Sequence, residues 1–69
     1  MNFVVCIKNT DYPASLEVRK IYQVLPDLKA HSHQMLRIID ESGEDYLYPN
    51  TYFMPIELSP TLQQVLEIS

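Results

Sequence analysis

The chain has 69 residues and one cysteine, is 46% hydrophobic, and carries nine acidic residues against five basic ones, for a net charge of −4. This length predicts one small domain, and a lone cysteine excludes a disulfide-stapled secreted miniprotein. The scattered bases argue against nucleic-acid binding, because phosphate contacts need a basic patch. The apolar opening is too short for a signal peptide or a membrane span, so we expect a cytoplasmic address and no membrane partner.

The first half of the chain predicts two strands separated by a long connection. Residues 3–7 are wholly apolar and rich in valine and isoleucine, which is typical of a strand buried on both faces. Residues 8–19 are rich in turn-forming types and predict a long connection rather than a tight hairpin. Residues 20–25 predict the second strand, which Pro26 stops because proline cannot donate to a sheet ladder.

The second half predicts a hairpin and a short last strand. A polar connection over 28–33, with room for one helical turn, leads into a third strand over 34–40. The only glycine, Gly43, supplies the positive φ that a hairpin tip requires, and residues 45–48 return as the fourth strand. Residues 49–52 predict one tight turn, and residues 53–57 predict an edge strand, because Pro55 lacks an N–H.

The last residues predict a short amphipathic helix over 60–68. Ser59 and Pro60 suit the N-cap and first helical positions, and an apolar stripe of Leu62, Val65 and Leu66 repeats at helical spacing. A helix of this length is only marginally stable in isolation. Its apolar stripe must therefore pack either on its own sheet or on a partner. We expect the helix to pack on its own barrel. The barrel over 1–58 and the helix over 59–69 then form a single domain. Deletion of residues 60–69 is expected to unfold this domain.

The order of these elements resembles the Src homology 3 (SH3) barrel: five short strands, a long first loop, a one-glycine hairpin and a single turn before the last strand. Residues 46–53, Y-L-Y-P-N-T-Y-F, resemble the family's G-Y-I-P-S-N-Y-V. The resemblance implies a mainly β fold, a five-stranded SH3-like barrel with a short C-terminal helix. It also implies that Pro49 and Tyr52 occupy positions that line the family's peptide groove, with Tyr12 as a partial substitute for another groove tyrosine.

The chain also resembles a loose set of short bacterial and phage proteins of unassigned function. The shared pattern is C-I-K-N at 6–9, K-I-Y-Q-V at 20–24, I-I-D-E-S-G-E-D at 38–45 and Y-P-N-T-Y-F at 48–53. This resemblance spans most of the chain. It implies the same barrel and a bacterial setting, and it implies no activity.

The tyrosines are the main candidates for a binding surface. Tyr46 and Tyr48 share one strand face. The tyrosine rings either cover the edges of the barrel, or Tyr12, Tyr48, Pro49 and Tyr52 form an aromatic platform that stacks on a proline-rich segment or cages a cation. The predicted partner-binding residues are a platform with its acidic rim: Tyr12, Tyr48, Pro49, Tyr52, Asp11 and Glu17.

Other reactive residue types favour structural roles. The acids flanking Gly43 predict a solvated hairpin tip, because the hairpin is too tight for a calcium loop. His31 and His33 fall short of the three or four ligands of a zinc site, so we predict no metal and no cofactor. Cys6 lies in an apolar strand, where burial makes a thiol inert, so we predict no catalytic residue and no enzyme activity.

The sequence therefore predicts a non-catalytic protein-interaction module of a bacterial cytoplasm, with a protein or peptide partner. Acids beside aromatic rings favour a partner segment that carries Lys or Arg. One alternative is a structural subunit or homodimer assembled through the C-terminal helix, although we expect a monomer. The other is an acidic inhibitor that occupies a basic groove on a nucleic-acid enzyme.

Overall fold

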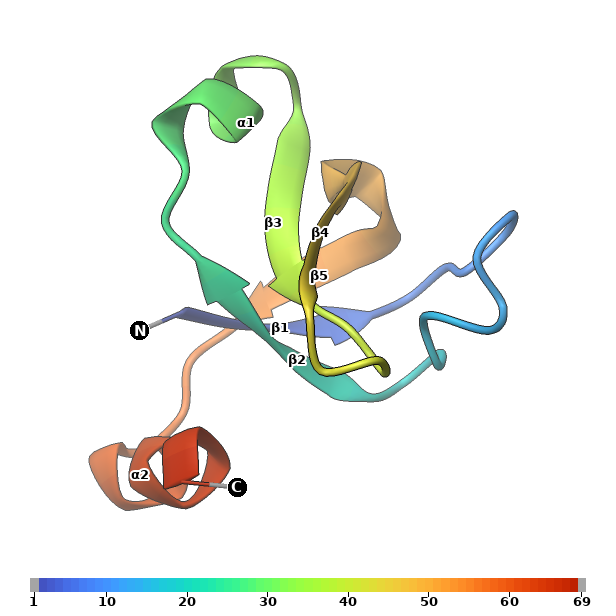
Figure 1. Ribbon diagram of the computed structural model, residues 1–69. Helices are drawn as coiled ribbons and strands as arrows, with labels where there is room; N and C mark the ends of the chain where they lie inside the picture. Colours follow the sequence, from blue (N-terminus) through green and yellow to red (C-terminus); the bar gives the residue numbers. More distant parts are fainter. Residues whose placement is uncertain (1, 69) are drawn as a thin grey trace.

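The computed structural model describes residues 2–68, a curved sheet with a helix at each of two ends (Figure 1). The elements in chain order are β1 (Asn2–Cys6), β2 (Ile21–Leu25), α1 (Leu28–Ser32), β3 (Met35–Ile39), β4 (Asp45–Pro49), the 3₁₀ helix η1 (Asn50–Tyr52), β5 (Phe53–Ile56) and α2 (Pro60–Ile68). The mainly β class, the five strands and the C-terminal helix are confirmed.

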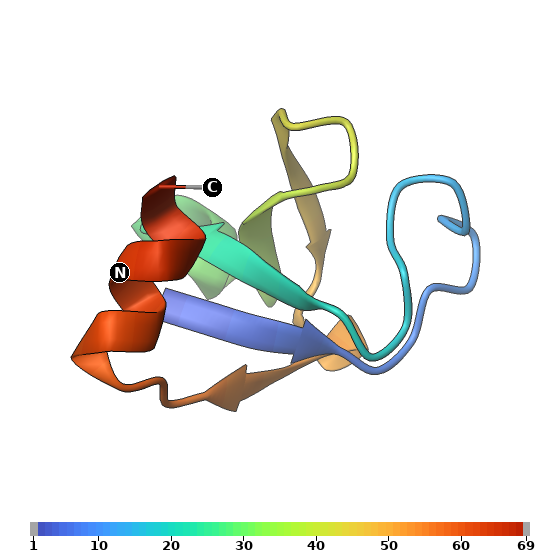
Figure 2. The same cartoon turned by 90° about the horizontal axis from the view of Figure 1, so that it is seen from below.

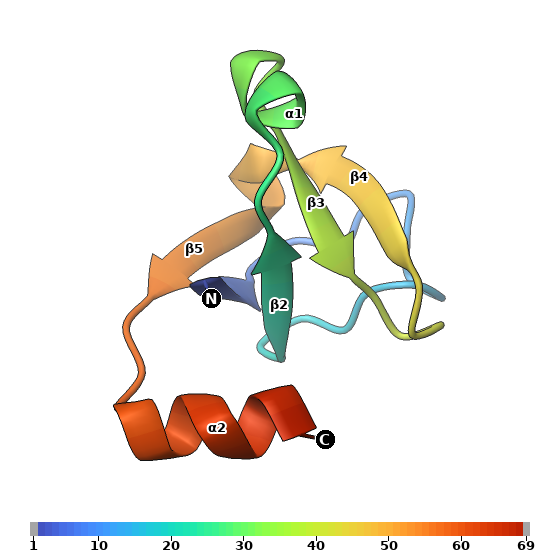
Figure 3. The same cartoon turned by 60° about the vertical axis from the view of Figure 1, so that its left-hand side comes forward.

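The strands form one antiparallel sheet in the order β4-β3-β2-β1-β5 (Figure 3). Val4 of β1 pairs with Tyr22 of β2 on one side and with Pro55 of β5 on the other. β4 and β5 form the edges, as predicted for the strand that holds Pro55, and no pairing joins these two strands within residues 2–68. The sheet is therefore open, and its predicted closure into a barrel is not confirmed by the strand pairing.

β1 is covered on both faces near its start. Phe3 and Val4, which point to opposite faces, are both 4% exposed. The prediction of a wholly buried run is wrong at its end, however, because Ile7 lies beyond the strand and is 48% exposed. The backbone N–H of Ile7 bonds to the Tyr52 carbonyl oxygen at 2.8 Å, so the chain leaves the sheet over η1.

The core cluster combines strand residues with Tyr52 of η1 and one residue from the first loop. Its members are Val4, Cys6, Leu16, Tyr22, Val24, Ile38, Tyr48, Tyr52 and Phe53. Leu16 is 1% exposed although the polar segment around it predicts an irregular connection. The loop wraps back on itself, since the Leu16 N–H bonds to the Tyr12 carbonyl oxygen at 3.0 Å and Asn9 Nδ2 bonds to the Leu16 carbonyl oxygen at 3.0 Å. The first loop is therefore anchored to the core by an apolar side chain.

α2 begins where its capping residues predict. The Ser59 hydroxyl accepts a hydrogen bond from the Leu62 N–H at 3.2 Å, and the Ser59 carbonyl oxygen accepts one from the Gln63 N–H at 2.9 Å. The helix lies beside the β1–β2 part of the sheet, at the opposite end from the first loop (Figures 1 and 2). Neither helix in the described part of the chain is long and apolar enough to cross a lipid bilayer.

The apolar stripe of α2 is only partly covered. Leu66 lines a groove against the sheet, whereas Leu62 is 43% exposed and Val65 is 57% exposed. No described residue of α2 belongs to the core cluster. Among the side chains that the structure describes, the core cluster therefore comes from the strands, η1 and the first loop, and α2 lies against the sheet as an appendage.

Candidate functional site

A shallow pocket of about 270 Å³ opens where the first loop meets the β3–β4 hairpin. We name it the tyrosine pocket, and its lining residues are Tyr12, Ser15, Asp40, Tyr46 and Tyr48. Tyr12 and Ser15 come from the first loop, Asp40 directly follows β3, and Tyr46 and Tyr48 belong to β4. The pocket therefore combines three aromatic rings with one acid.

The three rings of the tyrosine pocket are arranged as a floor and two walls. Tyr48 is 1% exposed, and its ring contacts Tyr12 edge to face, with 5.0 Å between centroids and 89° between planes. The ring centroid of Tyr46 lies 5.8 Å from that of Tyr48, with 46° between the ring planes, and Tyr46 is 61% exposed. Tyr48 thus forms the buried floor, and the half-buried Tyr12 and the exposed Tyr46 form the walls.

Backbone hydrogen bonds fix the loop side of the pocket against the hairpin. The Tyr12 N–H bonds to the Asn9 carbonyl oxygen at 2.9 Å, in a turn where Asp11 has a φ of 74°. The Glu41 N–H bonds to the Ser15 carbonyl oxygen at 3.1 Å, so the loop and the hairpin are joined beside the pocket. The walls are therefore held by different elements but do not move independently.

Asp40 sits at the edge of the pocket as a hydrogen-bonded carboxylate. Its Oδ2 accepts a bond from the Tyr48 hydroxyl at 2.6 Å, and its Oδ1 accepts bonds from both the N–H and the hydroxyl of Ser42. Partial burial acts to raise the pKa of the carboxyl, but the bonds from Ser42 and Tyr48 outweigh it and leave the pKa lowered. The pocket therefore presents a negative charge at neutral pH.

The Tyr48 hydroxyl remains a donor over the whole physiological range. Burial, and then the hydrogen bond to Asp40, raise its pKa to about 12. The neutral hydroxyl therefore keeps its proton directed at the carboxylate. This bond ties the floor of the pocket to its charge.

The structure brings together three of the predicted site residues, but with little exposed ring. Tyr12 contacts both Tyr48 and Tyr52, the latter at 6.0 Å between centroids. Tyr52 is 8% exposed, and its hydroxyl donates to the Thr10 carbonyl oxygen at 2.9 Å. Burial, and then the charge of Asp11, raise the pKa of Tyr52. Two of the three rings, Tyr48 and Tyr52, are therefore buried in the core and leave little surface for a ligand.

The other predicted residues lie around the pocket rather than in it. Asp11 and Glu17 are exposed on the first loop, and Pro49 is half-buried at the end of β4. None of the three lines the tyrosine pocket. The acids can contribute long-range charge, while the proline positions η1.

Sequence reasoning missed Asp40 and Tyr46 as site residues. The signal lay in the hairpin register, because Ile38 pairs with Tyr46 and Leu36 pairs with Tyr48. Since side chains alternate along a strand, Asp40 falls on the same face as both tyrosines. Its assignment to a solvated tip overlooked this shared face.

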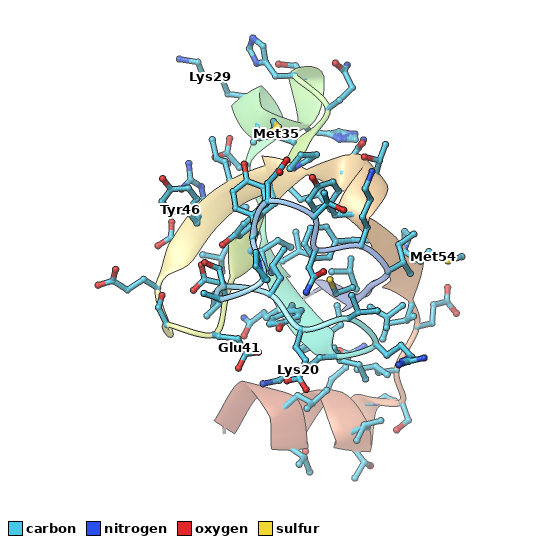
Figure 4. The ribbon with its side chains drawn as sticks, turned by 90° about the vertical axis from the view of Figure 1, so that its right-hand side faces the viewer. Lys20, Lys29, Met35, Glu41, Tyr46 and Met54 are labelled. Carbon is cyan, nitrogen blue, oxygen red and sulfur yellow. The ribbon has the colours of Figure 1, made fainter. Side chains whose placement is uncertain are left out.

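A larger groove of about 560 Å³ lies between the sheet and α2. Apolar residues line part of it, among them Phe3, Ile21, Ile39 and Leu66. Lys20 and Glu41 on its rim are paired, because Lys20 Nζ lies 2.8 Å from Glu41 Oε1 and 2.7 Å from Oε2; both residues lie beside α2 in Figure 4. Asp40 lines this groove as well as the tyrosine pocket. The groove can bury an apolar segment but presents no unmatched charge from this pair.

The third hollow, beneath α1, is dominated by one ion-pair network. Arg37 Nε lies 2.8 Å from Asp27 Oδ2, and Arg37 Nη1 lies 2.7 Å from Asp45 Oδ2. The N–H of Ala30, and then Arg37, lower the pKa of the Asp27 carboxyl. His33 lines the same hollow, with Nδ1 2.9 Å from the Lys29 carbonyl oxygen. Among the described side chains, no three His, Cys, Asp or Glu residues group closely enough to hold a metal ion.

Cys6 is a buried thiol inside the core. It is 0% exposed, and its Sγ donates to the Lys8 carbonyl oxygen at 3.2 Å. Burial raises its pKa, and this bond opposes the rise only in part. A neutral, enclosed thiol is a packing residue rather than a nucleophile.

Comparison of the chain with family models, with curated proteins and with solved structures gave no match.

Proposed function

We propose that this protein is a non-catalytic interaction module that binds a cationic side chain of a protein partner in the tyrosine pocket. The observation that carries the proposal is the hydrogen bond from the Tyr48 hydroxyl to the Asp40 carboxylate, which holds the charge beside the ring floor of the pocket. A cation that enters this pocket meets a negative charge and aromatic rings together. Cation–π contacts contribute about 0.5–1 kcal/mol at exposed sites, and the carboxylate adds a charge-assisted hydrogen bond.

The charge around the pocket supports a basic partner. The net charge of the chain is −4, and the exposed acid Glu44 lies two residues before Tyr46, whereas Asp45 between them is already paired with Arg37. Asp11 directly precedes Tyr12 on the opposite wall. Acids of one sign around a recess raise the rate at which a positively charged segment arrives, an effect that added salt weakens.

The scaffold of the module is proposed to be SH3-like. The strand order β4-β3-β2-β1-β5, with η1 directly before β5, supports this assignment. The proposed binding site nevertheless differs from the family's peptide groove, to which the resemblance assigned Pro49 and Tyr52. Tyr52 is 8% exposed and its hydroxyl is bonded within the fold, so it offers little ring to a proline-rich segment.

The proposal requires no cofactor and no nucleophile. The residues that bind the cation are the wall residues Tyr12 and Tyr46, the floor residue Tyr48 and the ionised carboxylate of Asp40. The thiol of Cys6 is enclosed in the core and takes no part. Binding to a partner is therefore the whole of the proposed activity.

Assembly through α2 is the second candidate, because the apolar side chains of Leu62 and Val65 keep about half of their surface exposed. A second copy that covers them would form a dimer. Light scattering over a range of concentrations tests this candidate. A mass that rises with concentration in the parent but stays monomeric in a Leu62→Ser, Val65→Ser variant supports it, and a constant monomer mass in the parent removes it.

Selection from a library of short random peptides displayed on phage tests the leading function. The parent should enrich peptides that carry Lys or Arg, and Tyr46→Ser should lose this enrichment because it removes the exposed wall. Met54→Ser is the matched control, since Met54 is 54% exposed on β5 and lies away from Tyr46 (Figure 4). Equal selection by the parent and by Tyr46→Ser, or enrichment without basic residues, would contradict the proposal.

A further inference from the structure

The hydrogen bonds already made by Asp40 determine what it still offers to a ligand. An ionised carboxylate has about four acceptor positions, two on each oxygen. Two donors from Ser42 occupy Oδ1, and the Tyr48 hydroxyl occupies one position on Oδ2. Among the contacts that the structure describes, this leaves one acceptor position, on Oδ2.

A single free acceptor position favours one of the two common cationic groups, the ammonium group of lysine or the guanidinium group of arginine. A guanidinium group binds a carboxylate best through two parallel N–H donors, one to each oxygen. Oδ1 of Asp40 is fully used, so this paired contact is blocked. An ammonium group is a compact point charge, and one donor suffices to join it to Oδ2.

The ring geometry also favours an ammonium group over a guanidinium group. A flat guanidinium group gains most when it stacks on the face of a ring or between two parallel faces. Tyr12 stands at 89° to Tyr48, and Tyr46 is tilted by 46°, so no two neighbouring rings of the pocket are parallel. A compact cation can instead approach the tilted faces from the pocket mouth without matching a plane.

We infer that the tyrosine pocket selects the primary ammonium group of a lysine side chain over the guanidinium group of arginine. This inference rests on the proposed function and specifies which cation the partner segment carries. The selectivity comes from Ser42, because its two donors occupy the oxygen that a guanidinium group would need.

The test uses three small probes with the full chain: N-acetyl-lysine methylamide, the corresponding arginine compound and the neutral norleucine compound. Amide proton and nitrogen shifts of residues 12, 15, 40 and 46 are followed during titration. The lysine probe should bind about ten- to a hundredfold more tightly than the arginine probe, the difference expected for one charge-assisted hydrogen bond. The norleucine probe should give no saturable shift.

Ser42→Ala is the decisive variant, because it removes the hydroxyl donor to Oδ1 and thereby opens a second acceptor position. Ser42 is exposed in the hairpin turn, so the fold should persist. The ratio of lysine to arginine affinity should fall toward one in this variant. Tyr46→Ser, in contrast, should weaken both probes by a similar factor and leave their ratio unchanged.

The possible outcomes separate the two proposals. Equal affinities for lysine and arginine in the parent, tighter arginine binding, or an unchanged ratio in Ser42→Ala would overturn the inference while leaving a cation site in place. If neither cationic probe shifts these residues in the parent, the proposed function fails together with the inference.

Discussion

The hydroxyl of Tyr48 donates a 2.6 Å hydrogen bond to Oδ2 of Asp40, and this bond joins a ring of the core to the charge of the tyrosine pocket. The floor of the candidate site is therefore also a core residue. A change at Tyr48 should affect stability and binding together, whereas a change at the exposed Tyr46 should affect binding alone.

Tyr48→Phe should lower the free energy of unfolding by about 1–2 kcal/mol while keeping the ring packing. The substitution removes one donor to an ionised, partly buried carboxylate, a loss of that order. Urea unfolding followed by circular dichroism measures it. Tyr46→Phe is the control and should change stability by less than about 0.5 kcal/mol, because that ring is exposed. Equal losses in the two variants would show that the bond between Tyr48 and Asp40 contributes nothing.

Stability should fall in acid through Glu41. The hydrogen bond from Lys20, and then that from the Tyr22 hydroxyl, lower the pKa of Glu41 below its ordinary value of 4.5. A carboxyl with a lowered folded pKa contributes stability that is fully present above its unfolded pKa and is lost as the pH falls through the folded pKa. The Tm should therefore drop as the pH decreases below about 4.5.

Glu41→Gln should flatten this part of the pH profile, because glutamine does not titrate. Glu57→Gln serves as the control, since Glu57 is exposed on the connector before α2. Thermal melts of the three proteins across the acid range provide the comparison. If the profiles of Glu41→Gln and the parent remain parallel, the ion pair with Lys20 is not the source of acid sensitivity.

Gly43→Val should cost about 1–2 kcal/mol of stability through backbone strain alone. Gly43 has a φ of +83°, and a Cβ added there would meet no atom within 4 Å, so no steric clash contributes. Gly43→Asn should cost less, because asparagine tolerates this conformation. Equal unfolding midpoints for Gly43→Val and the parent would show that the tip adapts its backbone freely.

The sheet should survive the loss of α2. The sequence alone predicts that deletion of residues 60–69 unfolds so small a domain. The core cluster, however, contains no described residue of α2, and Leu66 is the described α2 residue that lines the groove against the sheet. The truncated chain should keep a cooperative thermal transition and lose no more than about 1.5–3 kcal/mol, the value for one large apolar side chain. A truncated chain that is unfolded in water would contradict this expectation.

Local sequence signals predicted the strands and their ends well, because their causes are local. Pro26 ends β2, Ser59 caps α2, and Gly43 takes positive φ at the hairpin tip, each through its own backbone chemistry. Closure of the sheet into a barrel could not be predicted in this way, because it depends on how far strands that are distant in the sequence curve toward each other. No residue pattern in the chain sets that distance.

The first loop and the site were harder to predict because they depend on tertiary contacts. Leu16 is buried and Arg19 has a φ of 71°, yet neither residue type signals this within a polar connection. The predicted platform correctly joined Tyr12 to Tyr48, but it gave Tyr52 a surface role although only 8% of its surface is exposed. Asp40 was missed because its partners become visible only through the strand register.

Titration with a short oligolysine peptide, followed through the amide shifts of every residue, tests the central claim most directly. We expect saturable shifts centred on Tyr12, Ser15, Asp40 and Tyr46, which Tyr46→Ser and added salt each weaken. An oligoglutamine peptide of equal length should produce none of them. Shifts spread over all acidic residues, shifts centred on the groove beside α2, or no saturable shifts would contradict the tyrosine pocket as the binding site.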